Sequence, residues 1–270
     1  SHPKTGGKQI VCENWRNLIA VGSVPLAITN CLNFGNPEKE KTMSEFVECV
    51  EGMSEACSYL NYPVVSGNVS FYNETNNQGI KPTPAIGGVG LIKNIKNMIT
   101  MNLKEDNNIL IVIGKTEGNL NQSIFLREIM KKKSGPPPEI NLFNEKNNGL
   151  ALLQLFEKKL VLSAHDISAG GILICLAEMC IAGDLGVKIN SPKTLINLNQ
   201  YFFSEDQSRY IIEIQEKNIK QVFEILDKNS IFYEKIGVVQ KECMSLKEEF
   251  SITIKELKNF NNSWFKKYTN

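Results

Sequence analysis

Apolar residues recur at three- and four-residue spacing in two stretches near the start of the chain, which predicts two amphipathic helices. The first covers 7–22, where Gly22 fits a helix C-cap, and the second covers 43–60 and ends before Pro63. The polar residues 66–79 predict a loop. Short apolar runs predict strands at 25–31, at 64–65, which we expect to be buried, and at 85–92. Helices that alternate with strands in this way indicate an α/β fold.

The polar, interrupted segment 93–108 separates this part from a second set of elements. We therefore place a domain boundary near residue 104, which divides the chain into 1–104 and 105–270. The β-α-β order of the second part predicts an α/β sandwich, closed by a strand and a short helix. Its other predicted elements are strands at 109–113, 161–164, 210–214 and 232–239 and helices at 121–130, 147–159, 171–182 and 219–226.

Composition narrows the class of protein. Hydrophobic residues make up 42% of the chain, which is typical of a globular protein and excludes disordered and fibrous classes. No apolar run approaches the roughly 20 residues that span a bilayer, and no signal peptide is evident, so we expect a soluble, cytoplasmic protein without membrane contact. The 30 basic and 29 acidic residues leave a net charge of +1, so no overall field would attract nucleic acid.

Cysteine and histidine usage argues against a metal centre built from side chains of these types. The seven cysteines form no C-x-x-C pair and lie mostly in apolar segments, which predicts packed, reduced thiols. There are only two histidines, so a histidine cluster is excluded. Arginine is also scarce, and each of Arg16, Arg127 and Arg209 is a candidate for a site that needs a planar guanidinium.

Two polar stretches that follow predicted strands are candidates for ligand binding. One is 66–70, where Gly67 allows close backbone approach and Asn68 and Ser70 offer uncharged oxygens that suit phosphate or phosphate-bound Mg²⁺. The other is 30–37, which carries three asparagines before a helix. Both are also consistent with ordinary turns and strand-to-helix connections, and spacing alone does not separate these interpretations.

Three sites in the second part have both a functional and a structural interpretation. His165 and Asp166 form a dyad suited to proton transfer or to structural hydrogen bonding. Gly170 and Gly171 precede a helix whose N-terminus suits an anion. Arg209 follows two carboxylates, which suggests a salt-bridged strand entry.

Taken together, these stretches resemble the synthetase subunit of phosphoribosylformylglycinamidine synthase. The two most specific matches are 29–37 and 63–75, and the resemblance covers almost the whole chain in order. The later stretches also resemble relatives such as aminoimidazole ribonucleotide synthetase. The further stretches that carry the resemblance are 16–22, 82–84, 163–168 and 203–209.

The resemblance implies a fold of two α/β (α+β) domains, the N-type and C-type domains of aminoimidazole ribonucleotide synthetase. The family polypeptide has two tandem copies of this pair, and the chain resembles only the second copy, with the first domain incomplete. The family's catalytic histidine belongs to the first copy, so no catalytic residue is assigned here.

The resemblance also implies a reaction and a site. The family uses ATP to phosphorylate the amide oxygen of formylglycinamide ribonucleotide, and ammonia from a glutaminase then forms the amidine in purine biosynthesis. By motif position Asn30 and Gly67 contact ATP, Asn68 binds Mg²⁺ and Ser70 contacts substrate. Asn30 stands where many members have Asp, which removes a charge; Ala169 and Ser204 also depart from the family pattern.

Three hypotheses about function follow. The first is that the chain is part of an ATP-dependent amidoligase, with little activity alone, whose partners are the missing N-terminal half, a glutaminase subunit and a small bridging subunit. The second is a structural nucleotide site without chemistry. The third is a pairing module with an exposed sheet that self-associates. The first two require two loop tips, beginning at Asn30 and Ser66, to converge on a magnesium-bound polyphosphate.

Overall fold

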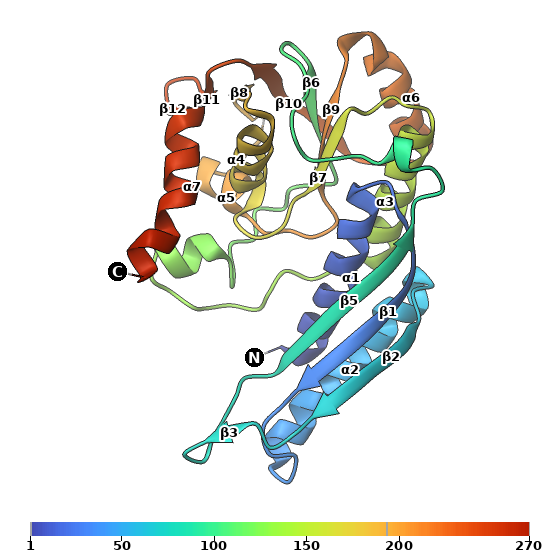
Figure 1. The fold of residues 1–270 in the computed structure, drawn as a ribbon, viewed down its shortest axis with the longest axis vertical. Helices are drawn as coiled ribbons and strands as arrows, with labels where there is room; N and C mark the ends of the chain where they lie inside the picture. Colours follow the sequence, from blue (N-terminus) through green and yellow to red (C-terminus); the bar gives the residue numbers. More distant parts are fainter. Residues whose placement is uncertain (1, 193, 270) are drawn as a thin grey trace.

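A computed structural model describes residues 2–192 and 194–269 of the 270-residue chain. Figure 1 shows a narrow lower part, built on a three-stranded sheet, below a broader part built on a seven-stranded sheet. No helix in the described part of the chain is both long and apolar enough to cross a bilayer. All seven cysteines are free thiols and four are buried, as their apolar settings predict.

The narrow part confirms both predicted helices and turns the predicted loop 66–79 into a strand and a hairpin. Gly22, with φ of +79°, follows the last turn of the first helix, as expected for a glycine beyond a C-cap. The elements are α1 (Pro3–Ala20), β1 (Val24–Asn33), α2 (Glu40–Leu60), β2 (Val64–Ser70), β3 (Glu74–Thr75), β4 (Gln78–Gly79), β5 (Thr83–Leu91) and the 3-10 turn η1 (Ile95–Asn97).

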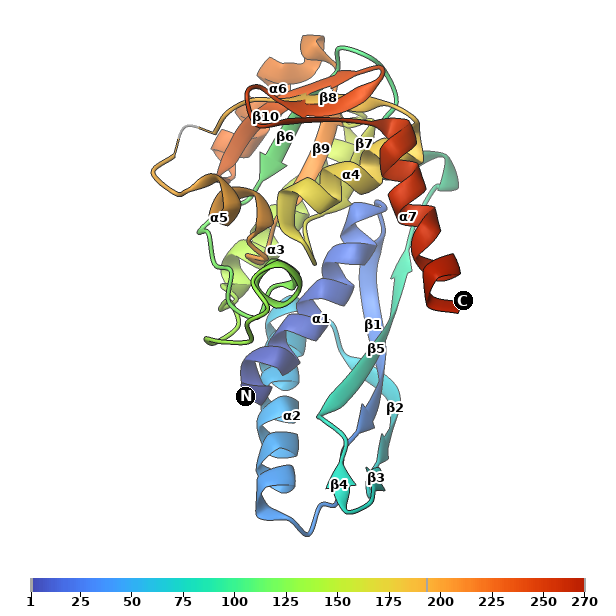
Figure 2. The same ribbon diagram turned by 90° about the vertical axis from the view of Figure 1, so that its left-hand side faces the viewer.

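The three-stranded sheet has one covered face and one open face. β1 lies in the centre, parallel to β2 and antiparallel to β5. Helices α1 and α2 lie on one side of the sheet, and the other side is uncovered in the view of Figure 2. Along β5 alternate residues are exposed, which is the burial pattern of a strand with only one face packed.

The expectation that Val64 and Val65 form a buried strand is wrong. They begin strand β2, but 45% and 68% of their surface is exposed, because β2 is an edge strand of a sheet with an uncovered face. Ser66, Gly67 and Asn68 continue this strand although their residue types favour turns. Backbone pairing with β1 overrides that local preference.

The broad part is an α/β sandwich around a mixed sheet of order β12-β11-β8-β10-β6-β9-β7. Of its six strand pairs only β8 with β11 is parallel. The elements are β6 (Ile109–Ile113), the π-helical turn η2 (Phe125–Ile129), α3 (Leu142–Glu157), β7 (Ser163–Asp166), α4 (Gly171–Gly183), β8 (Gly186–Ile189), α5 (Leu198–Phe203), β9 (Tyr210–Ile214), the 3-10 turn η3 (Glu216–Asn218), α6 (Ile219–Lys228), β10 (Tyr233–Gln240), β11 (Cys243–Leu246), β12 (Phe250–Thr253) and α7 (Ile254–Thr269).

Both faces of this sheet are packed, which explains why β6 and β9 are continuously apolar. In β6, Ile109, Ile111 and Ile113 belong to one hydrophobic cluster, whereas Leu110 and Val112 belong to a second cluster on the opposite face. The first cluster includes α3 and α6, and the second includes α4 and α5. Alternate side chains of one strand therefore serve two cores.

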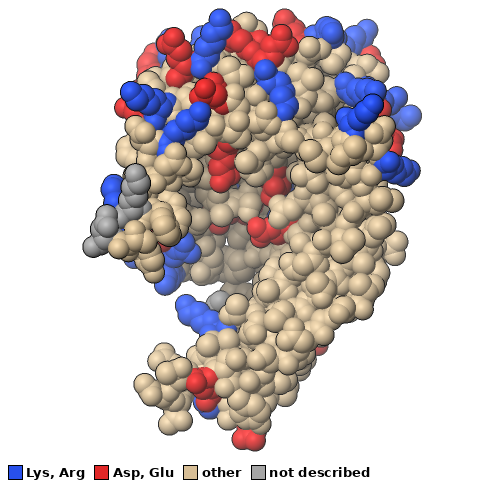
Figure 3. Space-filling view, in the orientation of Figure 1, with Lys and Arg blue, Asp and Glu red and all other residues tan. Residues whose placement is uncertain are grey.

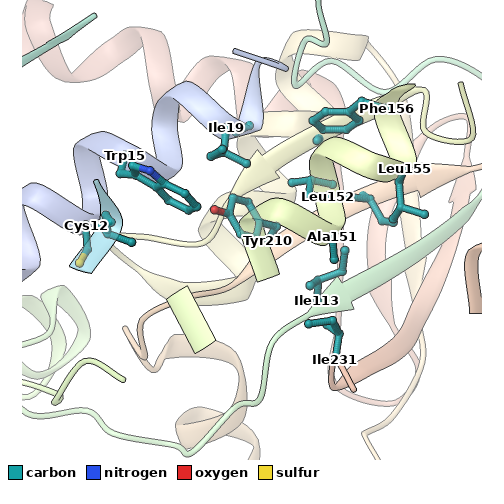
Figure 4. Close-up of a cluster of buried hydrophobic side chains, with 14 of the residues drawn as sticks. Cys12, Trp15, Ile19, Ile113, Ala151, Leu152, Leu155, Phe156, Tyr210 and Ile231 are labelled. Atoms are coloured by element: carbon teal, nitrogen blue, oxygen red, sulfur yellow. The ribbon is translucent and has the colours of Figure 1, made fainter. Parts of the chain in front are cut away.

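The first cluster also joins the two parts of the chain. Figure 4 shows Trp15 and Ile19 of α1 next to Leu152 of α3 and Tyr210 of β9. A Cβ at Gly149 would collide with the Trp15 ring, so this glycine lets α3 approach α1 closely. Helix α1 therefore covers the three-stranded sheet and also packs into the core of the sandwich.

Several elements of the sandwich differ from the prediction. The helix expected at 121–130 is reduced to η2, where the carboxylate of Glu205 accepts a hydrogen bond from the Ile124 amide at 2.7 Å. Strand β8 and helix α5 are short and were not predicted, because their few apolar residues give no clear periodicity. The closing helix α7 has 16 residues and is longer than expected.

Candidate functional site

The predicted nucleotide residues Asn30 and Gly67 are neighbours on parallel strands. They pair directly in the register of β1 with β2. A Cβ at Gly67 would collide with the Asn30 side-chain oxygen, so the amide of Asn30 lies over the bare backbone of Gly67. Asn30 lies two residues from each of the buried residues Ile28 and Leu32, so its side chain shares their face of the sheet. Asn30 and Gly67 therefore lie on the face toward the helices.

Asn68 and Ser70 project from the opposite face of the same sheet. Each follows Gly67 by an odd number of residues, and successive side chains of a strand point to opposite faces. They pair in register with Cys31 and Asn33 of β1. The structure thus brings all four predicted site residues onto adjacent strands, but it divides them between two faces.

The expectation that two loop tips converge on a polyphosphate is therefore wrong. Asn30 and Ser66 lie within paired strands, not at tips, and their pairing is set by the β1–β2 ladder. The loops that do follow these strands begin at Phe34 and Phe71. Both loops start at the same end of the sheet, because Asn33 and Ser70, the last residues of the two parallel strands, are in register.

A hydrogen-bond network joins these two loops. The side-chain amide of Asn73 donates to the Phe34 carbonyl at 2.9 Å and to the Ser70 hydroxyl at 3.2 Å. The Glu74 carboxylate accepts from Lys39 Nζ at 2.7 Å and from the Asn36 amide at 3.1 Å. The hydrogen bond from Lys39 lowers the pKa of Glu74, so this carboxylate is ionised.

Sequence reasoning missed the roles of Asn73 and Glu74, although both lie in a stretch that carries the family resemblance. The available signal was local: this polar pair lies within the predicted loop 66–79, shortly after the candidate residue Ser70. Its partners, Phe34 and Lys39, lie about 35 residues earlier in the chain, and only the parallel pairing of β1 with β2 brings them close.

A cavity of about 640 Å³ lies at the N-terminal end of α1, next to the start of β5. Its wall includes Pro82, Thr83 and Pro84, another stretch that carries the resemblance. Lys41 and Lys81 also line it, and the N-terminal end of a helix carries partial positive charge. The cavity thus combines a volume in the range of small-molecule pockets with two cations and one carboxylate, that of Glu45.

A second, smaller cavity of about 230 Å³ contains the predicted dyad His165 and Asp166, with Glu13, Ser168 and Glu178. His165 Nδ1 lies 3.3 Å from Asp166, and Nε2 lies 3.0 Å from Glu178. In the space-filling view of Figure 3, acidic side chains lie around a hollow near the centre of the molecule. Ala169, which departs from the family pattern, lies in the wall of this cavity. A carboxylate at this position would add further negative charge.

The environment of His165 favours its protonated form. Burial alone would lower the pKa of His165, but hydrogen bonds and charge from Asp166 and Glu178 raise it to about 9. The imidazole is therefore a cation held between two carboxylates at neutral pH. This arrangement argues against His165 as a general base, because a cation cannot accept a proton.

We expect the pairing of His165 to make stability depend on pH. A histidine whose pKa is raised on folding stabilises fully below its unfolded value of about 6.5, and this contribution is lost as pH rises towards 9. Urea unfolding of the wild type and His165→Gln, at about pH 6 and about pH 9.5, measures it. The difference in unfolding free energy should shrink at the higher pH. If the difference in unfolding free energy were the same at both pH values, a cationic His165 would be ruled out. Glu178→Gln, which removes one carboxylate, should narrow the pH range over which this difference changes.

The two remaining predictions for the sandwich need correction. Arg209 is fully buried and forms no salt bridge with the carboxylates that the structure describes: it donates to the Ser204 and Asp206 carbonyls at 2.7 and 3.0 Å and to the Thr116 hydroxyl at 2.9 Å. The helix N-terminus at Gly170 already holds an anion of the chain itself, since Glu205 accepts from its amide at 2.8 Å. Both segments are therefore structural.

Asn68 could supply one oxygen ligand to a magnesium ion. It is exposed, and its side chain makes no hydrogen bond to the residues that the structure describes, so its amide oxygen is free. In the described ranges, no three His, Cys, Asp or Glu side chains are placed to hold a metal ion. A cation at Asn68 would therefore need oxygens from phosphate and water, which Mg²⁺ commonly takes.

Comparisons with known proteins place the chain in a family. Residues 1–92 match the model "AIR synthase related protein, N-terminal domain", and residues 105–246 match the corresponding C-terminal domain. The chain is 56% identical over 268 residues to phosphoribosylformylglycinamidine synthase subunit PurL of Pelagibacter ubique, and 44% identical over 269 residues to PurL of Parvibaculum lavamentivorans. These matches cover 99% and 98% of the chain.

The chain spans only 37% and 36% of the length of these two curated relatives. Among solved structures it resembles T. maritima PurL complexed with FGAR, with a TM-score of 0.75 and 19% identity over 95% of this chain and 43% of that one. It also resembles E. coli HypE, a hydrogenase maturation protein, with a TM-score of 0.70 and 15% identity over 92% and 78% of the two chains. At this identity the structures show the fold alone.

The matches agree with the geometry, because the N-terminal match covers the three-stranded sheet and the C-terminal match covers most of the seven-stranded one. The sequence is related to PurL along its whole length. The chain belongs to the family of AIR synthase related proteins and carries that family's N-terminal and C-terminal domains in order.

Proposed function

We propose that this chain is a portion of an ATP-dependent amidoligase that converts formylglycinamide ribonucleotide to the amidine with glutamine-derived ammonia. The identity of 56% to a PurL subunit over nearly the whole chain supports this reaction. The observation that supports it most is structural: Asn68 and Ser70 project two residues apart from the open face of β2, and the backbone of the neighbouring Gly67 is exposed.

In this proposal the chain has its domain boundary near residue 104, and its N-terminal part holds the nucleotide. The backbone of Asn30 and Gly67 contacts ATP from the open face, Asn68 offers its oxygen to Mg²⁺, and Ser70 contacts the substrate. Mg²⁺ would neutralise charge on the triphosphate. The chain's own task is to position the γ-phosphate close to the substrate amide oxygen, which is a poor leaving group until it is phosphorylated.

The open sheet face argues that this site is completed by another polypeptide segment. Figure 3 shows that the surface over β5, β1 and β2 carries no charged side chains. It exposes Val89 and Leu91 of β5, and apolar patches of this kind are typical of protein interfaces. The proposed occupant is the N-terminal half of the same enzyme, and a glutaminase subunit and a small bridging subunit are its further partners.

The same open face favours a second candidate, in which the chain binds a structural nucleotide or only pairs with a partner. In that case the chain alone should self-associate through the open face. The candidates separate in a trans assay: amidine formation after the N-terminal half is added supports the ligase portion. Assembly without turnover supports the second candidate.

Isothermal titration of the full chain with ATP, with and without Mg²⁺, tests the nucleotide site. We expect Mg²⁺-dependent binding that weakens by at least about tenfold in Asn68→Ala, because one metal ligand is lost. Asn262→Ala, which changes an exposed asparagine of α7, is the matched control and should bind as the wild type does. Absence of binding at millimolar ATP, or equal binding by both variants, would contradict the assignment of Asn68.

A further inference from the structure

Ser70, which the proposed function assigns to the substrate, is hydrogen-bonded to the side chain of Asn73. Asn73 lies in the loop after β2, and this loop turns at Tyr72, a non-glycine residue with φ of +58°. The Tyr72 amide donates to the Gly35 carbonyl at 3.0 Å, and the Asn73 amide donates to the Phe34 carbonyl at 3.2 Å. A left-handed residue of this kind persists only where surrounding contacts hold it. The loop backbone therefore fixes the Asn73 side chain against the end of β2.

The side-chain nitrogen of Asn73 is occupied by backbone carbonyls. Nδ2 carries two hydrogens, and its two nearest acceptors are the Phe34 carbonyl at 2.9 Å and the Ser70 carbonyl at 3.0 Å. The Ser70 hydroxyl oxygen is a third and longer contact at 3.2 Å. Phe34 follows β1 and Ser70 ends β2, so the Asn73 amide is held from both strands. Its oxygen, Oδ1, consequently has a fixed position.

This oxygen takes the proton of the Ser70 hydroxyl. Ser70 Oγ donates to Asn73 Oδ1 at 3.3 Å, and Oδ1 is the one acceptor for this hydroxyl among the residues that the structure describes. A serine hydroxyl has one proton and two lone pairs. The proton is used within the chain and one lone pair faces Nδ2 of Asn73, so one lone pair remains. Ser70 is therefore able to accept a hydrogen bond from a ligand, whereas donating one would break its bond to Asn73.

We propose that Asn73 is a positioning residue that makes Ser70 a hydrogen-bond acceptor, so that Ser70 recognises an N–H or O–H group of the substrate and not a phosphate oxygen. This inference rests on the proposed function, in which Ser70 contacts formylglycinamide ribonucleotide. That substrate offers amide N–H groups and ribose hydroxyls as donors, whereas the oxygens of its phosphate are acceptors. Ser70 is partly exposed at the end of β2, as a contact with a ligand requires.

Steady-state kinetics of the chain assembled with the N-terminal half, with ammonium chloride as the source of ammonia, test the proposal. Ser70→Ala and Asn73→Ala should each raise the KM for formylglycinamide ribonucleotide by about tenfold, because one hydrogen bond to the bound substrate is lost. The kcat should change by less than about threefold. The double variant should also show a rise of about tenfold, because Asn73 acts through Ser70. Multiplied effects, about 100-fold, would overturn the positioning role.

The KM for ATP separates this role from a general disturbance of the loop. It should stay within about twofold of the wild-type value in both single variants, because neither side chain is assigned to the nucleotide. Asn73→Ser, whose side chain is one bond shorter, is a second variant with the same expected result. Gln78→Ala, which changes an exposed residue of β4, is the matched control and should behave as the wild type does. An equal rise in the KM for both substrates would overturn the proposal.

Two inhibitors identify the group that Ser70 recognises. Inorganic phosphate should inhibit the wild type and Ser70→Ala equally, and weaker inhibition of Ser70→Ala would overturn the proposal. Ribose 5-phosphate carries the hydroxyls and the phosphate but no amide. If only ribose 5-phosphate inhibits Ser70→Ala about tenfold more weakly, the recognised donor is a ribose O–H. If inhibition by ribose 5-phosphate is unchanged while the KM for formylglycinamide ribonucleotide rises, the donor is an amide N–H.

The wild-type assembly distinguishes this inference from the proposed function. Absence of amidine formation by the wild type would overturn the proposed function and this inference with it. Amidine formation by the wild type, together with an unchanged KM for formylglycinamide ribonucleotide in Ser70→Ala, would overturn this inference and leave the reaction standing.

Discussion

Replacing Arg16 with alanine should destabilise the protein by about 3–5 kcal/mol, because it leaves a buried carboxylate without its counter-charge. Arg16 of α1 donates to Glu145 of α3 at 2.8 Å and to Gln207 at 2.8 Å. Arg16 is 1% exposed and Glu145 is fully buried. Burial opposes the charge on Arg16, but Glu145 raises the pKa of Arg16, so the guanidinium stays protonated. Urea unfolding of both proteins measures the difference in free energy.

Arg127→Ala is the matched control, since Arg127 is exposed and pairs with the neighbouring Glu128 at the surface. Its unfolding free energy should change by less than about 1 kcal/mol. The double variant Arg16→Met with Glu145→Leu should regain most of the lost stability, because neither charge remains buried. Similar losses for Arg16→Ala and Arg127→Ala would show that the buried pair does not join the two parts of the chain.

Gly52→Ala should destabilise the protein by about 1–3 kcal/mol, although alanine favours helices. Gly52 lies in α2, where a Cβ would overlap the backbone carbonyl of Lys4 in α1. Backbone atoms cannot rotate away, so the two helices must separate. Their packing covers the inner face of the three-stranded sheet that carries Asn30 and Gly67. Thermal and urea unfolding both measure the effect.

Gly6→Ala provides the comparison, because Gly6 lies in α1 and a Cβ added there would have no described neighbour within 4 Å. It should stabilise the protein by up to about 1 kcal/mol through helix propensity alone. Opposite signs for the two substitutions would demonstrate that close helix contact, and not local propensity, determines the effect at Gly52. Stabilisation by both would contradict the close packing of α1 on α2.

Periodicity predicted most of the fold because it reports directly on burial. β6 and β9 were predicted with their observed bounds, since both have unbroken apolar runs that are buried on two faces. Strand β2 was predicted only in part. Its polar residues 66–70 resemble a turn in composition, and their strand conformation depends on backbone pairing with β1, which leaves no signal in side-chain chemistry.

The candidate site shows the same division. Motif resemblance selected Asn30, Gly67, Asn68 and Ser70, and the structure places them on adjacent strands. Strand alternation, not residue type, divides them between two faces. Likewise, the sequence marked Arg16 and Arg209 as scarce residues, but it did not show that one pairs with Glu145 and that the other binds neutral oxygens.

The sequence by itself therefore determined the family, the alternation of helices and strands and the identity of the polar residues available for ligand binding. These properties follow from local patterns: periodic apolar positions, glycine and proline placement, and motif order. Only the tertiary structure decided which polar side chains meet, which anion occupies the N-terminus of α4, and which face of the first sheet stays open. The physical reason is that contacts such as Arg16 with Glu145 join residues 129 positions apart, and their geometry is set by how whole elements pack.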